Sequence, residues 1–361
     1  MNKKVTYTLS AIILILLIFI GYREFSANNH HAVMAVTGAT PVAYRQAVPC
    51  DLSLEVTGTL EKDYTFDNDA LNALAPTYIR TREVTPEGKF MGTYRYHGIP
   101  VLHVLEGIPV KKPDDAAFDG PHDIVVTFIN ADGKESRFSY GELTMTTDCL
   151  PVTLAYNREQ LVPSKDPEKY NKNVYRENID GLRLVCPRDR DDSRYLDNVV
   201  KMTLTVPYAQ GSLLPKTQKG LKCTSSGVSR IVGEKSMPVT YSGVASARYD
   251  EWIRVGHGRG YKGISKAAGY DLRSFLRKNF PGCDRESWFL FTACDGYRCL
   301  FSGREIFEHQ AGQDMMLITT LDGRPHKSGP MLGPVSDYYV DRDVWGLTHV
   351  MVIENMNKKA E

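Results

Sequence analysis

The sequence predicts an α+β fold made of two tandem, β-rich, mixed-sheet domains that follow an N-terminal transmembrane helix. Three observations support this: an apolar run near the N-terminus, an order of elements that occurs twice, and helical patterns that are few and short. A length of 361 residues suits two or three domains at about 150 residues each. Charged residues make up 24% of the chain and the net charge is +1, so no basic field indicates a nucleic-acid partner.

The first 22 residues predict a signal-anchor helix. Lys3 and Lys4 precede an apolar run that ends at Tyr22 and is just long enough to span a membrane. Because the lysines stay inside, we expect an anchor in the inner membrane and soluble domains in the periplasm or another extracytoplasmic space. The alternative is a cleaved signal peptide, with a cleavage motif at 33–35 that lies rather far from the run.

Composition divides the chain into five parts. A polar, alanine-rich tether follows the anchor, and a segment rich in proline and glycine separates two longer regions of alternating apolar character. The predicted parts are the anchor 1–22, the tether 23–49, a first domain 50–206, a linker 207–222 and a second domain 223–361.

The two long regions have the same order of elements. Each begins with an aromatic-basic strand end, a glycine and apolar residues at helical spacing. Two strands joined by an Asp-Gly turn come next, then an apolar stretch ending in a turn, and finally an arginine before an apolar-rich strand. The segments are 94–106, 124–139, 154–161 and 194–204 in the first copy, and 261–277, 288–302, 318–325 and 342–353 in the second. A duplicated domain explains this order better than one large irregular domain.

Two further elements are expected in the first domain alone. Alternating apolar residues at 52–60 predict a strand. Asp67 or Asp69 is expected to cap a short helix at 70–74, which Pro76 would stop.

Several short motifs together resemble the molybdopterin-binding domain of the sulfite oxidase type. They are a Gly-Ile-Pro-Val helix entry at 98–101, an Asp-Gly-Tyr hairpin at 295–297 with a partial match at 132–133, a glycine-to-proline segment at 181–187, and closing strands at 193–204 and 341–353. The resemblance covers most of both copies. It implies that family's fold in two tandem divergent copies and a molybdopterin cofactor.

The chain departs from that family at the metal ligand. Catalytic members supply a cysteine thiolate to molybdenum from a segment upstream of the Gly-Ile-Pro-Val element. The matching stretches here, 78–98 and 241–263, contain no cysteine, and Cys50 and Cys223 lie too far upstream. A soft metal centre held by a thiolate needs that sulfur. We therefore expect no bound metal or cofactor, and a binding or accessory protein attached to a membrane redox system. The alternatives are a molybdopterin-dependent oxidoreductase and a structural spacer.

One segment has the composition of a binding site. Arg254, His257, Arg259 and Lys262 lie among four glycines, which let backbone N–H groups approach an anion while the arginines contact a phosphate. These four residues are the candidate cofactor-binding set. The alternative is a flexible basic loop between two strands. No residue is assigned a catalytic role.

Two other features have competing interpretations. The charge run at 189–192 is expected to form a solvated turn rather than a Ca²⁺ site, because it lacks the spacing and the glycine of a Ca²⁺ loop. Cys294 and Cys299 flank an Asp-Gly turn and either form a disulfide across the hairpin or remain two thiols.

Overall fold

The computed structural model describes residues 51–146, 150–161, 175–208, 214, 216–218, 221, 224–256, 258 and 260–353. The chain divides into two compact units, Met1–Ala47 and Val48–Glu361, and all described residues belong to the second. The predicted anchor and tether therefore lie outside the described residues. Within the part of the chain that is described, no helix is long and apolar enough to cross a membrane.

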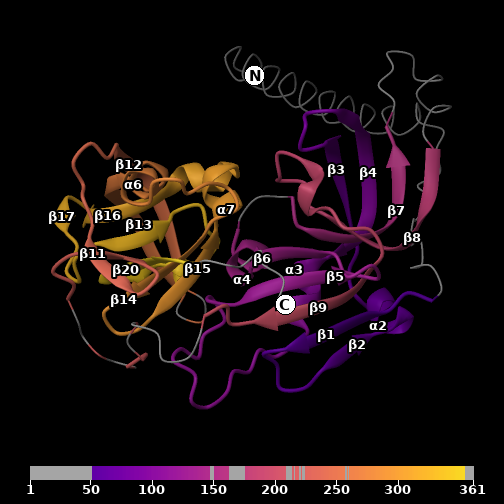
Figure 1. Cartoon of the computed structure of the whole chain (residues 1–361), viewed down its shortest axis with the longest axis horizontal. Helices are drawn as coiled ribbons and strands as arrows, with labels where there is room; N and C mark the ends of the chain where they lie inside the picture. The colour runs from indigo at the N-terminus through magenta and orange to yellow at the C-terminus, as the bar shows by residue number, and fades with distance from the viewer. Residues whose placement is uncertain are drawn as a thin grey trace, which may run out of the picture. The chain divides into compact units, whose positions relative to one another are not determined.

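The first half of the second unit contains two sheets (Figure 1). One is mixed and has the order β2-β1-β9-β5-β6, in which β1 runs parallel to β9 and the other neighbours are antiparallel. The other is antiparallel and has the order β3-β4-β7-β8. The strands are β1 (Leu54–Gly58), β2 (Tyr64–Phe66), β3 (Thr77–Val84), β4 (Phe90–Pro100), β5 (Val125–Asn130), β6 (Glu135–Ser139), β7 (Thr153–Gln160), β8 (Tyr175–Val185) and β9 (Val199–Thr205).

The second half also contains a mixed and an antiparallel sheet. The mixed sheet has the order β11-β10-β20-β14-β15, with β10 parallel to β20. The antiparallel sheet has the order β12-β13-β16-β18-β19, and β17 pairs with β16. The strands are β10 (Ser229–Val232), β11 (Lys235–Pro238), β12 (Ser246–Gly256), β13 (Gly260–Asp271), β14 (Trp288–Ala293), β15 (Arg298–Ser302), β16 (Met315–Leu321), β17 (Arg324–Pro325), β18 (Met331–Pro334), β19 (Val344–Trp345) and β20 (Leu347–Val352).

The two mixed sheets have the same strand order and the same strand directions. Their β5–β6 and β14–β15 hairpins come from the segments that the repeat predicts. The strands β5 and β14 are almost entirely buried, which fits their largely apolar sequences. The hairpin turns hold Gly133 and Gly296 at φ values of 75° and 84°, a backbone region that glycine adopts without strain.

Helices in the described part of the chain are few and short, so the fold is mostly β. The helix predicted at 70–74 is α2, and the Asp67 carboxylate caps it by accepting a hydrogen bond from Ala70 N at 2.9 Å. The helices are α2 (Asn68–Ala73), α3 (Val101–Glu106), α4 (Tyr140–Thr144), α6 (Leu272–Asn279) and α7 (Gly303–Phe307), with 3₁₀ turns η1 (Asp192–Arg194), η2 (Gln310–Asp314) and η3 (Val340–Arg342).

Side-chain packing, rather than a shared sheet, joins the two halves. Among the described residues, one isolated bridge between Thr146 and Asp337 is the only strand-like pairing across the junction. Each half has its own apolar core. A further cluster packs Val125 of the first half against Trp288 and other buried side chains of the second. Burial of side chains of this size contributes about 1.5–3 kcal/mol each, so this cluster holds the halves together as one unit.

Cys294 and Cys299 do not form a disulfide with each other. Cys294 is disulfide-bonded, whereas Cys299 is a free, fully buried thiol on β15, so the two are not joined to each other. In strand β15 the Cys299 side chain belongs to the apolar core of the second half. Packing into that core explains why Cys299 is not available across its own hairpin.

Candidate functional site

The junction is organised around a Ser-x-x-Glu segment that occurs once in each half. Ser139 caps α4 by accepting a hydrogen bond from the Glu142 N–H at 3.0 Å. Ser302 caps α7 in the same way, accepting from the Glu305 N–H at 3.1 Å. In a capping box, each glutamate side chain would turn back to its own cap residue. Here each glutamate side chain extends to the other half instead.

The two segments exchange side-chain hydrogen bonds across the junction. The Ser302 hydroxyl donates to Glu142 Oε2 at 2.9 Å, and the Ser139 hydroxyl donates to Glu305 Oε2 at 3.2 Å. Both glutamates are fully buried. Each half therefore supplies a donor to the other half's buried carboxylate, and the exchange gives the junction an approximate twofold symmetry.

An arginine that closes the first copy neutralises the first of these carboxylates. Arg194 Nη2 lies 2.7 Å from Glu142 Oε1 and 2.6 Å from Asp189 Oδ1. Arg194 Nε also donates to Asp189 Oδ2 at 2.7 Å, so the pairing with Asp189 is bidentate. The guanidinium lies 4.1 Å from the centre of the Phe138 ring. The buried guanidinium charge is thus paired with two carboxylates and packed against an aromatic ring.

The second copy repeats this arrangement. Arg342 pairs with Glu305 and bonds Asp337 through two nitrogens, each at 2.6 Å. Its guanidinium lies 4.5 Å from the centre of the Phe301 ring. Arg194 and Arg342 are the arginines that the sequence repeat places at equivalent positions, so the repeat predicted their equivalence but not their partners.

The acidic partners differ in pKa between the halves. Burial pushes the pKa of Glu142 upward, but Arg194 and then His309 outweigh it, and the pKa is lowered. Burial raises the pKa of Glu305, Arg342 offsets this only in part, and the charge on Glu142 adds to it. Burial also raises the pKa of Asp337 to about 6, against the attraction of Arg342. A proton is therefore bound more readily on the second-half side.

The charge run at 189–192 is not the solvated turn that the sequence analysis predicts. The Asp189 side chain is 1% exposed and is held by Arg194. Asp191 is also buried, and its carboxylate accepts from Arg285 of the second half at 2.6 and 3.0 Å. The prediction is wrong because Arg194, five residues on, pairs with Asp189, and Arg285, 94 residues on, covers Asp191.

His309 of the second half contacts both carboxylates that Arg194 neutralises. Its Nε2 lies 3.0 Å from Asp189 Oδ1 and its Nδ1 lies 3.9 Å from Glu142 Oε1. Ligand atoms of these three residues lie within 4.8 Å of one another, as in a metal site. However, Arg194 Nη2 already contacts both carboxylates, so a metal ion would have to displace a guanidinium. The arrangement fits an ion-pair network better than a metal site.

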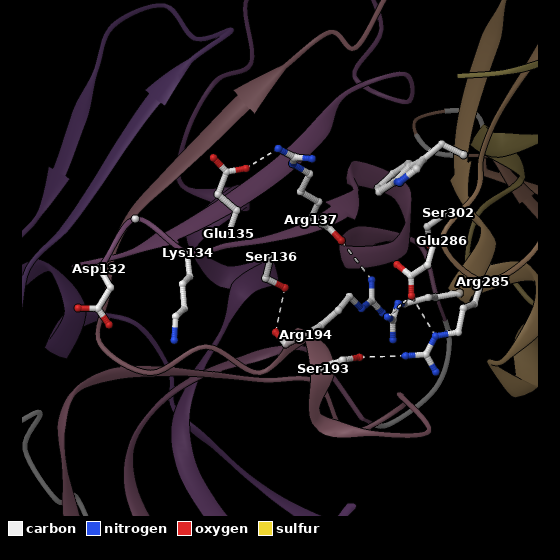
Figure 2. Close-up of a pocket in the computed structure, with 13 residues that line it drawn as sticks. Asp132, Lys134, Glu135, Ser136, Arg137, Ser193, Arg194, Arg285, Glu286 and Ser302 are labelled. Atoms are coloured by element: carbon white, nitrogen blue, oxygen red, sulfur yellow. Dashed lines mark hydrogen bonds and ion pairs between the residues drawn. The ribbon is translucent and has the colours of Figure 1, made fainter. Parts of the chain in front are cut away.

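A cavity of about 540 Å³ opens beside this network, with walls from both halves (Figure 2). Figure 2 shows Arg285 of the second half reaching Ser193 of the first, at 3.0 Å. The lining residues are Asp132, Gly133, Lys134, Glu135, Ser136, Arg137, Ser193, Arg194, Arg285, Glu286, Trp288, Ser302 and Arg304. Eight of these side chains are charged and they come from both halves, so we take this cavity as the candidate functional site.

The lining chemistry suits binding of a polar ligand rather than nucleophilic catalysis. Five side chains are cationic and three are acidic, and no histidine or cysteine is among the described lining residues. Arg285 and Arg304 are committed to carboxylates, among them Glu286. The Lys134 ammonium, by contrast, makes no hydrogen bond or ion pair with the described residues, so it is available to a ligand.

The structure brings two of the four predicted cofactor-binding residues together. Arg254 on β12 lies 5.6 Å and Lys262 on β13 lies 5.5 Å from the centre of the Trp345 ring. His257 and Arg259 lie outside the described residues. Neither Arg254 nor Lys262 lines the 540 Å³ cavity. The two described cations of this segment therefore lie on the paired strands β12 and β13 and share an aromatic contact.

Arg248, another cation near this segment, points elsewhere. It pairs with Asp250 at 2.7 Å on the surface, and its side chain is 66% exposed. Of these cations, Arg254 and Lys262 lie beside the Trp345 ring, whereas Arg248 does not. The junction residues were not predicted from the sequence, although the repeated Phe-Ser-x-x-Glu at 138–142 and 301–305 is a signal that points to them.

The free thiols in the described residues are poorly placed to bind a metal. Burial raises the pKa of Cys186 and of Cys299, both of which are fully buried. Burial also raises the pKa of Cys283. Each of these thiols keeps its proton at neutral pH, whereas a metal ligand must be a thiolate.

Comparisons with known proteins give little support to any specific assignment. No family model matches the chain, and no curated protein matches it. The crystal structure of the sulfane dehydrogenase SoxCD from Paracoccus pantotrophus is similar to it at 13% sequence identity, over 83% of this chain and 79% of that one, with a TM-score of 0.31. This similarity is too low to carry an argument about fold or function.

Proposed function

We propose that this chain is a binding or accessory protein that does not itself carry out molybdenum catalysis. It would be held at the inner membrane by its N-terminal segment, with two molybdopterin-oxidoreductase-like domains outside the cytoplasm and a membrane redox protein as partner. The family assignment within this proposal rests on the order of the sequence motifs. The same two-domain unit would present the 540 Å³ cavity as its binding site.

The state of the thiols is the observation that carries this proposal. Molybdenum in the sulfite oxidase family is held by a cysteine thiolate. The described thiols are held protonated by burial, and Cys294 is already in a disulfide. A thiol in an apolar core would have to lose its proton and move outward before it could bind a metal.

The character of the cavity supports a binding role as well. Its charged side chains are mostly paired with one another, and its hydroxyls come from Ser136, Ser193 and Ser302. Such a surface recognises a polar or zwitterionic ligand through preformed hydrogen bonds. Ser302 and Ser193 donate to the carboxylates of Glu142 and Asp191, which are already paired with arginines and so are weak general bases.

A second candidate function is a molybdopterin-dependent oxidoreductase of the sulfite oxidase type. The observation that favours it is the convergence of Arg254 and Lys262 on Trp345. Two cations beside an indole ring could contact the phosphate and the ring system of a pterin. Molybdopterin is therefore the cofactor to test.

The test is a measurement of metal and pterin in the exported protein. The chain would be produced in a host with an intact molybdenum-cofactor pathway and analysed for molybdenum and tungsten by mass spectrometry, and for pterin by fluorescence after oxidation. We expect neither in well-folded protein. Near-stoichiometric metal with pterin would overturn the proposal in favour of the oxidoreductase.

Matched variants locate any pterin that is found. Loss of pterin from the Arg254→Ala/Lys262→Ala double variant, but not from Arg248→Ala, would place it beside Trp345. Arg248 is a suitable control because it lies on the same strand as Arg254 but pairs with an exposed aspartate.

A further inference from the structure

A second cavity, of about 690 Å³, lies within the second half of the unit. One wall is the outward face of β12, and the other is the segment between β18 and η3. Its volume lies within the range of small-molecule sites, roughly 300–1,000 Å³. It shares no lining residue with the 540 Å³ cavity.

Aromatic and aliphatic side chains form much of its surface. Tyr249 lies on the β12 wall, and Tyr338 and Tyr339 lie on the other. The rings of Tyr338 and Tyr339 meet edge to face, with centres 4.8 Å apart and planes at 77°. Tyr338 is 61% exposed and Ile253 is 60% exposed, so these apolar surfaces face solvent across the cavity.

All ionisable groups of this lining other than the tyrosines are acidic. They are Glu251, Asp314 and Asp337, and no lysine or arginine is among the described lining residues. Asp337 is committed to Arg342, and Asp314 accepts from the Ser336 hydroxyl at 2.8 Å. The Glu251 carboxylate makes no ion pair or hydrogen bond with the described residues. The cavity therefore has an uncompensated negative charge beside aromatic rings.

The wall that carries Tyr338 is fixed in place. The Tyr338 backbone N–H donates to Met145 O of the first half at 2.7 Å. Asp337, next to it, is held by the bidentate contact with Arg342. The ring is therefore presented by an anchored backbone, which lowers the conformational entropy that the protein would lose when a ligand binds.

The equivalent strand of the first half has a different surface. Strand β3 occupies the position of β12 in the repeated sheet, and its outward side chains include Arg80 and Arg82, both exposed. The fold thus does not require an acidic and aromatic surface at this position. The chemistry of the cavity is particular to the second half.

We propose that the 690 Å³ cavity binds a small organic cation of the alkylammonium or quaternary ammonium class. The cationic head lies against Tyr338, Tyr339 and the Glu251 carboxylate, and the apolar body lies against Ile253. The negative faces of the tyrosine rings attract such a cation. The carboxylate adds a Coulomb attraction that an uncharged ligand would not feel.

The experiment is a ligand-observed NMR titration of the full chain. Choline is the probe, and 3,3-dimethyl-1-butanol, its uncharged isostere, is the control ligand. We expect choline to bind at least ~5-fold more tightly than the isostere, because ring attraction and the carboxylate both require the charge. Equal binding of the two, or no binding of choline, would overturn the proposal.

Variants of exposed residues test the two contacts separately. We expect Tyr338→Leu and Glu251→Gln each to weaken choline binding by about 2- to 5-fold, and Tyr338→Phe to retain it, since the ring remains. Arg80→Gln on the first half is the matched control and should change nothing. Choline binding that survives both Tyr338→Leu and Glu251→Gln would place the cation elsewhere and refute the assignment.

Two further measurements, one with potassium and one with lipid vesicles, show what attracts choline to the cavity. Displacement of choline by potassium at the same concentration would show simple charge attraction and overturn the proposal. Binding to phosphatidylcholine vesicles without binding of free choline would assign the cavity to a lipid surface, contrary to our inference. None of these results depends on the presence or absence of molybdopterin.

Discussion

Replacing Arg342 with methionine tests whether the buried network holds the two halves together. Arg342 is fully buried and is the cation that Glu305 and Asp337 share. Methionine keeps most of the volume but leaves two carboxylates without a counter-charge in the interior. Removing one partner of a buried ion pair costs about 3–5 kcal/mol, and we expect a loss of that size in the free energy of unfolding at neutral pH.

The loss should shrink as the pH falls. Burial already places the pKa of Glu305 and of Asp337 above the values of an unfolded chain. Without Arg342 these values rise further, so the folded variant takes up protons that the unfolded chain does not. A raised folded-state pKa favours folding at low pH and loses that contribution as the pH rises through it. The variant should therefore recover part of its stability between neutral pH and about pH 5.

The assay is urea unfolding followed by tryptophan fluorescence at both pH values. Arg248→Met is the control, because its exposed pair with Asp250 should contribute no more than about 1 kcal/mol. A loss of unfolding free energy below about 1 kcal/mol for Arg342→Met, or a loss that does not change with pH, would refute the idea that this buried arginine stabilises the fold by neutralising two carboxylates.

Three further predictions follow from the packing. Ser139→Ala removes both the α4 cap and a donor to the other half's carboxylate, and should lower the free energy of unfolding by roughly 1–3 kcal/mol in a urea melt. Gly269→Ala would place a Cβ 1.9 Å from a carbonyl oxygen of β16 and should lower the melting temperature, whereas Gly227→Ala, which meets nothing within 4 Å, should not. Cys186 and Cys299 should resist a thiol reagent at mildly alkaline pH in the native protein and react once the protein is unfolded, because burial raises the pKa of both thiols. Rapid labelling of both thiols in the native protein, measured by mass spectrometry, would contradict this prediction.

The order of elements was predictable because each element has a local signal. The Asp-Gly turns need a left-handed glycine, and the structure has one at Gly133 and one at Gly296. The apolar runs on either side of each turn form the expected hairpins. Arg194 and Arg342 occupy equivalent positions, as the repeat indicates. Periodicity and turn chemistry act over a few residues, so they can be read without knowledge of the tertiary structure.

The junction could not be read in this way because its contacts are distant in the sequence. Ser-x-x-Glu alone predicts a local capping box, yet Ser302 donates to Glu142 across 160 residues. The acidic run at 189–192 looked like a solvated turn for the same reason, since Arg285 covers Asp191 from 94 residues away. A run of charged residues does not reveal which distant side chain will cover its carboxylates in the folded protein.

The exchange of serine donors also constrains the order in which the chain can acquire its structure during synthesis. When the first half leaves the ribosome, Glu142 has Arg194 nearby, but its donor Ser302 has not yet been made. Domains generally fold as units from the N-terminus. The first half therefore exposes its junction face until the segment of the second half that carries Ser302 has been synthesised. Prematurely terminated chains would keep that face uncovered, which would mark them for proteolysis.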